Sequence, residues 1–211
     1  CGAWSRLDPA AIGEFRRMEV WDAGGSGRIE FDSANLCVST LGYIVNQWDL
    51  ESALRAALTD LGSEVTPLAE LERVEGGRTR IIAHGADGVQ LIARVLVGAD
   101  GVRSRVRELA GIDYRSQPYA QQALACTVRT SLPHAQVARQ RFLATGPLAF
   151  LPLADPYTCG IVWTTTPEQA RRLQLQEVAT FCTELAAAIG QVLGDIVECG
   201  PRAVFPLQRA Q

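Results

Sequence analysis

Lysine is absent from this 211-residue sequence: all 20 basic residues are arginine, against 23 acidic residues. The formal net charge of −3 argues against a broad electrostatic attraction to nucleic acid, so we expect no nucleic-acid partner. The longest apolar runs have about ten residues, well short of the ~20 that span a bilayer. No charged-then-apolar signal pattern opens the chain. These absences favour a cytoplasmic location.

The sequence also lacks any CxxC pair, although it has six cysteines. Zinc binding and thioredoxin-like chemistry therefore have little support. Cys126, Cys159 and Cys182 lie in apolar runs, so we expect reduced core residues in a reducing compartment. His84 and His134 have no cysteine or carboxylate at ligand spacing, and we expect both to face solvent. We expect no metal site and no catalytic acid or base.

What is present is ordinary globular composition, 47% hydrophobic and 20% charged, in a chain long enough for a sizeable core. A glycine-rich turn at 24–27 predicts a hairpin, and Gly62 is placed to end a helix. The elements expected up to Gly62 are a short helix at 8–17, strands at 18–22, 28–32 and 43–45, and a helix at 47–61.

Residues 64–97 are typical of a β-meander, with turn signals at Gly76-Gly77 and Ala86-Asp87-Gly88. Its expected strands are 64–66, 69–74, 79–84 and 89–97. Beyond Gly111 the expected elements are strands at 119–129, 137–144, 148–153 and 159–165, helices at 167–172 and 175–189, and a strand at 196–206. This order predicts an α+β / α/β fold, with a mixed β-sheet domain assembled from two sequence segments and flanked by helices.

The most informative motif is the turn Gly98-Ala99-Asp100-Gly101, between a strand-like run and a helix-competent segment. Its glycines permit positive φ and close approach of a ligand, and Asp100 can accept hydrogen bonds from ribose hydroxyls or backbone N–H groups. Ser104 can cap the following helix, whose N-terminus suits phosphate oxygens. An ordinary capped Asp-Gly turn is the alternative. The full pattern, which includes Arg107, favours a nucleotide site.

Residues 97–107, which read VGADGVRSRVR, resemble the Asp-Gly motif of FAD-dependent aromatic hydroxylases, the superfamily that includes para-hydroxybenzoate hydroxylase. Similarity to the ubiquinone-biosynthesis branch, the 2-polyprenylphenol and benzoquinol hydroxylases, is carried by the helix with Leu50 and Leu54 and by segments 18–22, 41–46, 146–153 and 205–207. The resemblance implies an FAD-dependent, NAD(P)H-using monooxygenase that hydroxylates a polyprenylated phenol or quinol ring. It implies substrate-domain segments at 1–45 and 113–211 around a partial FAD-binding domain at 46–112.

The resemblance also implies site residues. Gln47 would lie near the flavin pyrophosphate and Leu71 near the adenine; alternatively, Gln47 only begins its helix and Leu71 only packs in the core. The implied cofactor-binding residues are Gly98, Asp100, Gly101, Arg107, Gln47 and Leu71. The implied substrate pocket, whose residues could equally be strand core, consists of Phe150, Leu151, Pro152, Phe205 and Pro206. The protein would supply a dry, apolar pocket and FAD the chemistry.

Two superfamily motifs have no counterpart in the sequence: the GxGxxG strand–helix for the FAD pyrophosphate and the Gly-Asp motif for the ribityl chain. We therefore expect an internal fragment that alone holds no FAD and is inactive. An unpaired strand ending at Val97 would favour a homodimer through the sheet edge, and the substrate would favour peripheral association with the inner membrane or a multienzyme assembly. The alternatives are a non-redox module that binds an isoprenoid or a partner, and another Asp-Gly flavoenzyme (reductase, epoxidase or halogenase).

Overall fold

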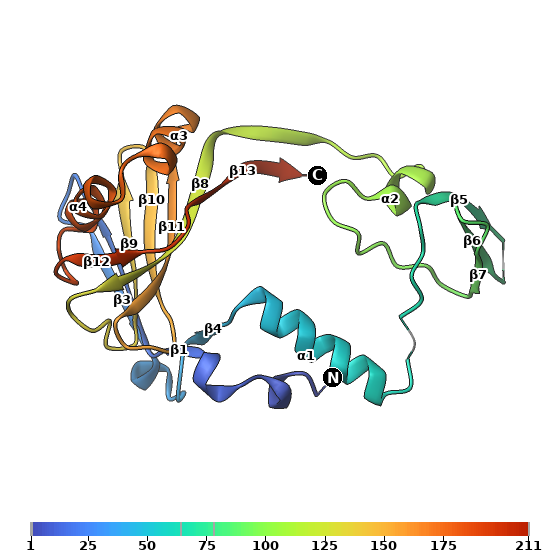
Figure 1. The fold of residues 1–211 in the computed structure, drawn as a ribbon, viewed down its shortest axis with the longest axis horizontal. Helices are drawn as coiled ribbons and strands as arrows, with labels where there is room; N and C mark the ends of the chain where they lie inside the picture. The colour runs from blue at the N-terminus through green and yellow to red at the C-terminus, as the bar shows by residue number, and fades with distance from the viewer. Residues whose placement is uncertain (1, 64, 78, 211) are drawn as a thin grey trace. The chain divides into compact units, whose positions relative to one another are not determined.

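A computed structural model describes residues 2–63, 65–77 and 79–210 (Figure 1). The chain divides into two compact units. The first joins the residues up to Leu61 with 118–209, and the second holds 62–117 and the carboxyl-terminal end. The first boundary falls after the helix at 47–60, whereas the sequence places it before that helix. Cys1 and Glu64, which figure in the sequence predictions, lie outside the described residues.

The first unit is built on an eight-stranded sheet of the described residues, in the order β12-β8-β11-β10-β9-β2-β3, with β13 also paired to β8. The paired strands whose register is described run antiparallel, except β2 and β9, which are parallel. A mixed sheet was predicted, and the hairpin around residues 24–27 is confirmed. The strands are β2 (Arg17–Asp22), β3 (Arg28–Asp32), β8 (Ser116–Thr130), β9 (Val137–Leu143), β10 (Gly146–Pro152), β11 (Thr158–Thr165), β12 (Ile196–Cys199) and β13 (Ala203–Ala210).

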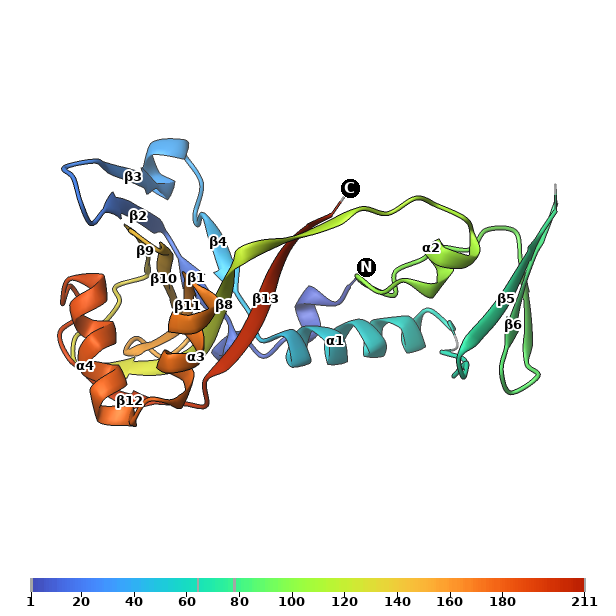
Figure 2. The same ribbon diagram turned by 90° about the horizontal axis from the view of Figure 1, so that it is seen from above.

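Two helices, α3 (Pro167–Leu175) and α4 (Val178–Ile189), lie on the same side of this sheet (Figures 1 and 2). Alternate strand residues point to that side, because side chains in a strand alternate between the two faces. They form the main core with the apolar faces of the helices. Its fully buried members include Leu124, Phe150, Ile161, Trp163, Leu173, Phe181, Leu185 and Ile189.

The ends of α3 and α4 are specified by local sequence. Thr166 caps α3, whose first residue is proline, and the carboxylate of Glu177 accepts from the Thr180 N–H at 3.0 Å to start α4. This cap explains why α4 begins at Val178 and not at the predicted 175. Gly190, with φ +82°, ends the helix, and Arg141 donates to the carbonyl of Ala188 there at 2.9 Å.

A two-stranded sheet of β1 (Gly13–Phe15) and β4 (Gly42–Ile44) and the helix α1 (Gln47–Asp60) complete the first unit. Asn46 caps α1, and Gly62 has φ +68° beyond its end, as the sequence predicts. The short helix predicted at 8–17 is wrong. Only Pro9–Ala11 form a 3₁₀ turn, because Gly13–Phe15 pair with β4 instead.

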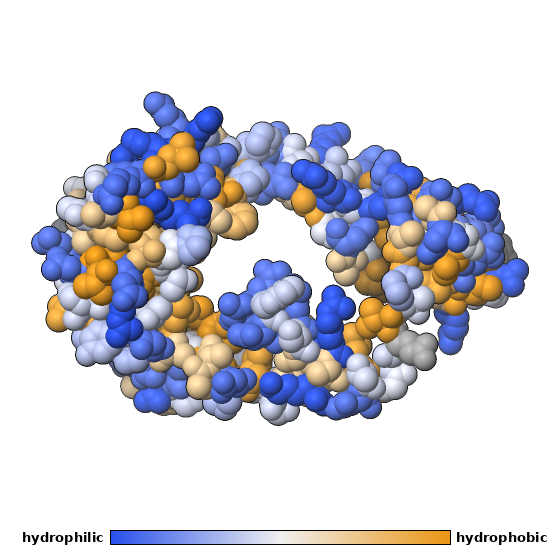
Figure 3. Space-filling view, viewed as in Figure 1, coloured by the Kyte–Doolittle hydropathy of each residue, from blue (hydrophilic) through white to orange (hydrophobic). Residues whose placement is uncertain are grey.

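The second unit contains a three-stranded antiparallel sheet of β5 (Leu71–Gly76), β6 (Ile81–Gly85) and β7 (Gln90–Ala93), followed by the short helix α2 (Arg105–Leu109). The meander is confirmed in outline, but Val65 and Thr66 are not in a strand. The predicted strand running into Gly98 is wrong beyond Ala93. Val95 and Val97 are 70% and 77% exposed, and no described strand pairs with them. An apolar β-branched run forms a strand only where a neighbour accepts its hydrogen bonds. Hydrophobic surface is visible over the region of β5, β6 and β7 (Figure 3).

Both histidines depart from the expectation that they face solvent. His134 is only 3% exposed; its Nε2 lies 3.1 and 3.0 Å from the carbonyl oxygens of Leu153 and Asp155, and its Nδ1 accepts from the Gln136 N–H. These contacts fix the N–H on Nε2 and tie a loop to the end of β10. His84 is half-buried in β6 beside Arg73 and Glu75. Among the described residues, no group of three or more histidine, cysteine, aspartate or glutamate side chains is placed to hold a metal ion.

The core predicts that alanine substitution at two leucines has different effects on the free energy of unfolding. Leu185 of α4 is fully buried, whereas Leu175 of α3 is 74% exposed. Replacing Leu185 with alanine removes buried methyl groups and leaves a cavity, so we expect a loss of about 2–5 kcal/mol in the free energy of unfolding. Leu175→Ala is the control, with a change within about 0.5 kcal/mol. Urea denaturation followed by circular dichroism measures both, and equal losses would contradict this core.

Candidate functional site

The loop from Gly98 to Ser104 leads into α2, and each glycine in it has a steric reason. A Cβ on Gly98 would lie 3.1 Å from the side chain of Val106, so any other residue there would require a shift of a few tenths of an ångström where the loop packs on α2. Gly101 has φ +83°, a conformation that other residues rarely adopt. The turn is therefore specified by its sequence independently of any ligand.

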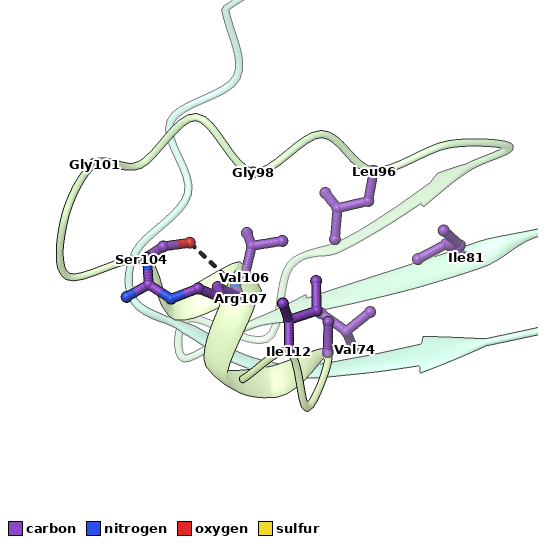
Figure 4. Close-up of a pocket in the computed structure, with 10 residues that line it drawn as sticks. Val74, Ile81, Leu96, Gly98, Gly101, Ser104, Val106, Arg107 and Ile112 are labelled. Carbon is purple, nitrogen blue, oxygen red and sulfur yellow. Dashed lines mark hydrogen bonds between the residues drawn. The ribbon is translucent and has the colours of Figure 1, made fainter. Parts of the chain in front are cut away.

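Asp100 makes the central contacts of the loop, and all of them go to the start of α2. One carboxylate oxygen accepts from the Ser104 hydroxyl, and the other accepts from the N–H groups of Arg105 at 2.7 Å and Val106 at 3.1 Å. The Ser104 hydroxyl in turn accepts from the Arg107 N–H at 3.0 Å (Figure 4). The sequence left open whether Asp100 accepts hydrogen bonds from ribose hydroxyls or from backbone N–H groups. In the structure it accepts from backbone N–H groups.

These contacts change the acidity of Asp100. The Ser104 hydroxyl, and then the Val106 N–H, stabilise the charged form and lower the pKa of the Asp100 carboxyl to about 2. Asp100 is therefore ionised at neutral pH. Its role in the loop is to hold the glycines beside α2 while it caps that helix.

A cavity of about 430 Å³ lies against this loop (Figure 4). Its wall on one side is the loop and α2, with Gly98, Gly101 and Arg107 among the lining residues. Its other wall is apolar and comes from β5, β6 and the segments on either side of the loop and helix: Val74, Ile81, Leu96 and Ile112. Three of the predicted cofactor residues thus share one cavity with Asp100 behind them.

The groups around this cavity fit one side of a dinucleotide. Among the described residues, the backbone N–H groups of Gly98 and Gly101 have no acceptor. Arg103 lies in the same loop, outside the cavity lining, and is exposed without an ion pair. Free donors and a free cation suit phosphate oxygens, and the apolar wall suits a flat ring. Arg107 is partly engaged, because it donates to the Val102 carbonyl and stacks on Tyr114 at 3.7 Å.

Leu71 joins the same site through a contact that sequence reasoning missed. Its carbonyl accepts from the Arg105 guanidinium at 3.1 Å, which ties α2 to β5. Any adenine contact at Leu71 must therefore share or avoid that carbonyl. The chain offers no local signal for such a pairing, because 34 positions separate the two residues.

Gln47 belongs to the first unit. It is the first residue of α1, is exposed, and donates to Glu51 at 2.7 Å. Its neighbours Asn46 and Asp49 line a second cavity, of about 380 Å³. The sheet side of that cavity includes Thr127, Leu153, Thr158 and Gly160, and Ile44 and Val45 close it from β4. Sequence reasoning did not single out these sheet residues, although their period-2 alternation with core positions was visible.

The predicted substrate residues do not all lie together. Phe150 is buried in the core beneath α3 and α4, while Leu151 lies on the opposite face of the sheet, next to Gly160. Pro152 is buried at the end of β10. Phe205 and Pro206 are exposed in β13. None of the five lines the second cavity, although Leu151 pairs with Gly160, which does.

Comparison with known families gives a match over most of the chain. The family model described as an FAD binding domain matches residues 9–195. The chain is 32% identical to 3-demethoxyubiquinol 3-hydroxylase of Escherichia coli, over 99% of this chain and 53% of that protein. It is 34% identical to the mitochondrial ubiquinone biosynthesis monooxygenase COQ6 of Mus musculus, over 89% and 41%. The chain spans about half the length of the curated relatives it matches. These relatives confirm the resemblance drawn from the sequence.

Solved structures match the fold. PqsL of Pseudomonas aeruginosa, in a mutant form, matches with a TM-score of 0.69 and 21% identity over 98% of this chain and 58% of that one. The p-nitrophenol 4-monooxygenase PnpA of Pseudomonas putida matches with a TM-score of 0.68 and 13% identity over 95% and 52%. At these identities the likeness concerns the fold alone, and it confirms the predicted α+β class.

The capped loop predicts an acid-sensitive α2. Because the folded pKa of Asp100 is depressed, its ionised form stabilises the loop above its ordinary pKa of 3.8, and this contribution is lost as the pH falls toward about 2. We expect the amides of Arg105 and Val106 to lose hydrogen-exchange protection over that interval. Asp100→Asn should show the loss already at neutral pH, since one carboxylate oxygen is replaced by a donor. Asp113→Asn, at an exposed position outside the cap, is the control; equal protection in both variants would contradict the assignment.

Proposed function

The chain belongs to the FAD binding domain family, and we propose that the protein it forms is an FAD-dependent, NAD(P)H-using monooxygenase that hydroxylates a polyprenylated phenol or quinol ring. The observation that carries this proposal is the alignment of almost the entire chain with a 3-demethoxyubiquinol 3-hydroxylase. The capped Gly98–Gly101 loop, with its free donors, supports it from the side of the cofactor.

FAD, when bound, supplies the oxidation–reduction chemistry of the proposed reaction. We assign Gly98, Gly101 and Arg107 to contacts with it, because they line the first cavity. Asp100 is a positioning residue, since its oxygens already bind Ser104 and the start of α2. Gln47 presents an exposed amide at the amino terminus of α1, where an anionic group is favoured. Leu71 contributes through its backbone.

The sheet face opposite α3 and α4 is assigned to the substrate ring. The second cavity combines apolar walls from Ile44 and Val45 with the hydroxyls of Thr127 and Thr158, and the carboxylates of Asp49 and Asp155 also line it. Such a lining offers apolar contacts to the ring and hydrogen-bonding groups to its oxygens. Leu151 lies beside this cavity, on the same face as Gly160. We keep Pro152, Phe205 and Pro206 as the adjoining boundary and Phe150 as the core support beneath it.

A ring with a long apolar tail has to be taken from a membrane or from another protein. We therefore propose peripheral association with the inner membrane or a multienzyme assembly. Within the described ranges, no helix has the length and apolarity of a membrane span. A homodimer through the exposed 94–97 segment is a further proposal, and its premise is the unpaired backbone of that segment.

The proposed function predicts that NAD(P)H oxidation is coupled to hydroxylation of the substrate ring. In the intact protein, FAD-bound enzyme should oxidise NAD(P)H slowly alone and faster when a 2-polyprenylphenol or demethoxyubiquinol is added, with one hydroxyl appearing on the ring. Stopped-flow absorbance follows the oxidation, and mass spectrometry follows the product. A protein that binds the polyprenylphenol without flavin, or oxidises NAD(P)H with no gain in product mass, would contradict the proposal.

The Gln47 assignment predicts an effect on FAD affinity. Gln47→Ala in the intact protein should weaken FAD binding about tenfold, the cost of one hydrogen bond to a charged group. Glu51→Ala is a matched control, because it removes the same Gln47–Glu51 bond but keeps the amide. Its FAD affinity should stay near that of the unaltered protein. Flavin fluorescence on titration measures both, and equal losses would show that Gln47 only supports its helix.

A further inference from the structure

Helices pack on one face of the sheet of the first unit, the covered face. We call the other face open because it is only partly buried: Val162 is 36% exposed there, although Ala138 is 3% exposed. α3 and α4 pack on the covered face, where Leu124, Ile161 and Phe150 are buried. The open face carries the alternate residues, and cross-strand pairing aligns them in rows. One row runs across six strands from β8 to β3 and consists of Ala125, Val162, Ala149, Gln140, Val20 and Ile29.

This row contains no charged residue, and Gln140 is its single polar member. Beside it, Thr127 and Gly160 occupy the β8–β11 end of a second row, and Met18 and Phe31 occupy its β2–β3 end. Glu19 and Arg28 alternate with these positions and form an ion pair on the other face. Asp22, the last residue of β2, alternates onto the open face beyond the row. The open face is therefore an apolar path across the sheet.

Size and exposure vary along this path. Its residues are small at Gly160, near the β8 end, and at Ala149, in the middle, so the surface is low at both places. Its far end at β3 has large, exposed ones: Ile29 is 58% exposed and Phe31 48%. Five strand spacings separate β8 from β3, which gives a length of about 24 Å. The near end opens into the second cavity, which Thr127 and Gly160 also line.

We propose that the open face binds the isoprenoid tail of the substrate, with the tail running from the second cavity across β11, β10, β9 and β2 to Ile29 and Phe31. This inference rests on the proposed function, which places the ring in that cavity. A tail of several isoprene units matches the length of the path.

The chemistry of the face favours a hydrocarbon chain over a protein segment. A docked polypeptide brings backbone N–H and C=O groups that need partners, and protein interfaces supply about one hydrogen bond per 100–200 Å². The row of the open face offers the amide of Gln140 alone. An isoprenoid has no hydrogen-bonding groups, so burying it here leaves none unpaired.

This inference is tested by measuring, in the intact protein, how binding affinity depends on the length of the isoprenoid tail. The probes are ubiquinone-type benzoquinones without a tail and with one, two and four isoprene units, and quenching of tryptophan fluorescence reports binding. We expect the affinity to rise by about tenfold per isoprene unit at first, from partial burial of its carbons. Ala149→Phe, which raises the surface there, should remove the gain beyond the first unit.

Variants at the far end sharpen the test. Ile29→Asn should leave the tail-free and one-unit probes unchanged and weaken the four-unit probe about fivefold. Val197→Asn is the matched control: Val197 is 56% exposed, and it lies on the other edge strand, β12. Tail-independent binding of the ring, or equal effects of the Ile29 and Val197 variants, overturns the tail path and leaves the proposed function standing. Failure of every probe to bind, with or without a tail, counts against the proposed function itself.

Discussion

The burial of one sheet face by α3 and α4 is the constraint on which the first unit depends. Once Phe150, Ile161 and Leu124 point into that core, strand geometry sends their neighbours to the opposite face. Leu151, Gly160 and Ala125 therefore come to the open surface without any signal of their own. The same packing that stabilises the unit determines which residues can contact a ligand. The core and the candidate substrate surface both follow from the alternation of strand side chains between the two faces of the sheet.

The loop and helix of the second unit are held together in a different way, by the hydrogen bonds of a single carboxylate. Asp100 binds the start of α2, Gly98 lets the loop lie against Val106, and Arg105 fastens the helix to β5 through Leu71. The loop is thereby held with its remaining backbone N–H groups free. A cofactor that meets such a loop loses little affinity to ordering it, which is the benefit of preorganisation.

Much of the fold and part of the candidate site could be predicted from the sequence. The helix beginning at Gln47, the hairpin around 24–27, the strands of the large sheet and the Asp100 motif all follow from caps, glycines and periodicity. What failed depended on partners distant in the chain. The 94–97 run reads as a buried strand but has no described neighbour to pair with. His134 reads as a loop residue, yet the carbonyls of Leu153 and Asp155 bury it. Phe150 and Leu151 both read as pocket residues, and only the sheet register separates them.

The parallel pairing of β2 with β9 bears on how the chain is made. Every other described pair in the large sheet is antiparallel, but β2 can gain this neighbour only after the whole 62–117 unit and β8 have been synthesised. Until then the β2–β3 hairpin has an unsatisfied edge and its apolar residues are in water. The entropic cost of closing a loop grows only slowly with loop length, so inserting the second unit between β2 and β9 costs the folded state little stability. The delay is kinetic: during translation, the unpaired edge of the hairpin is open to wrong pairing until β9 has been synthesised.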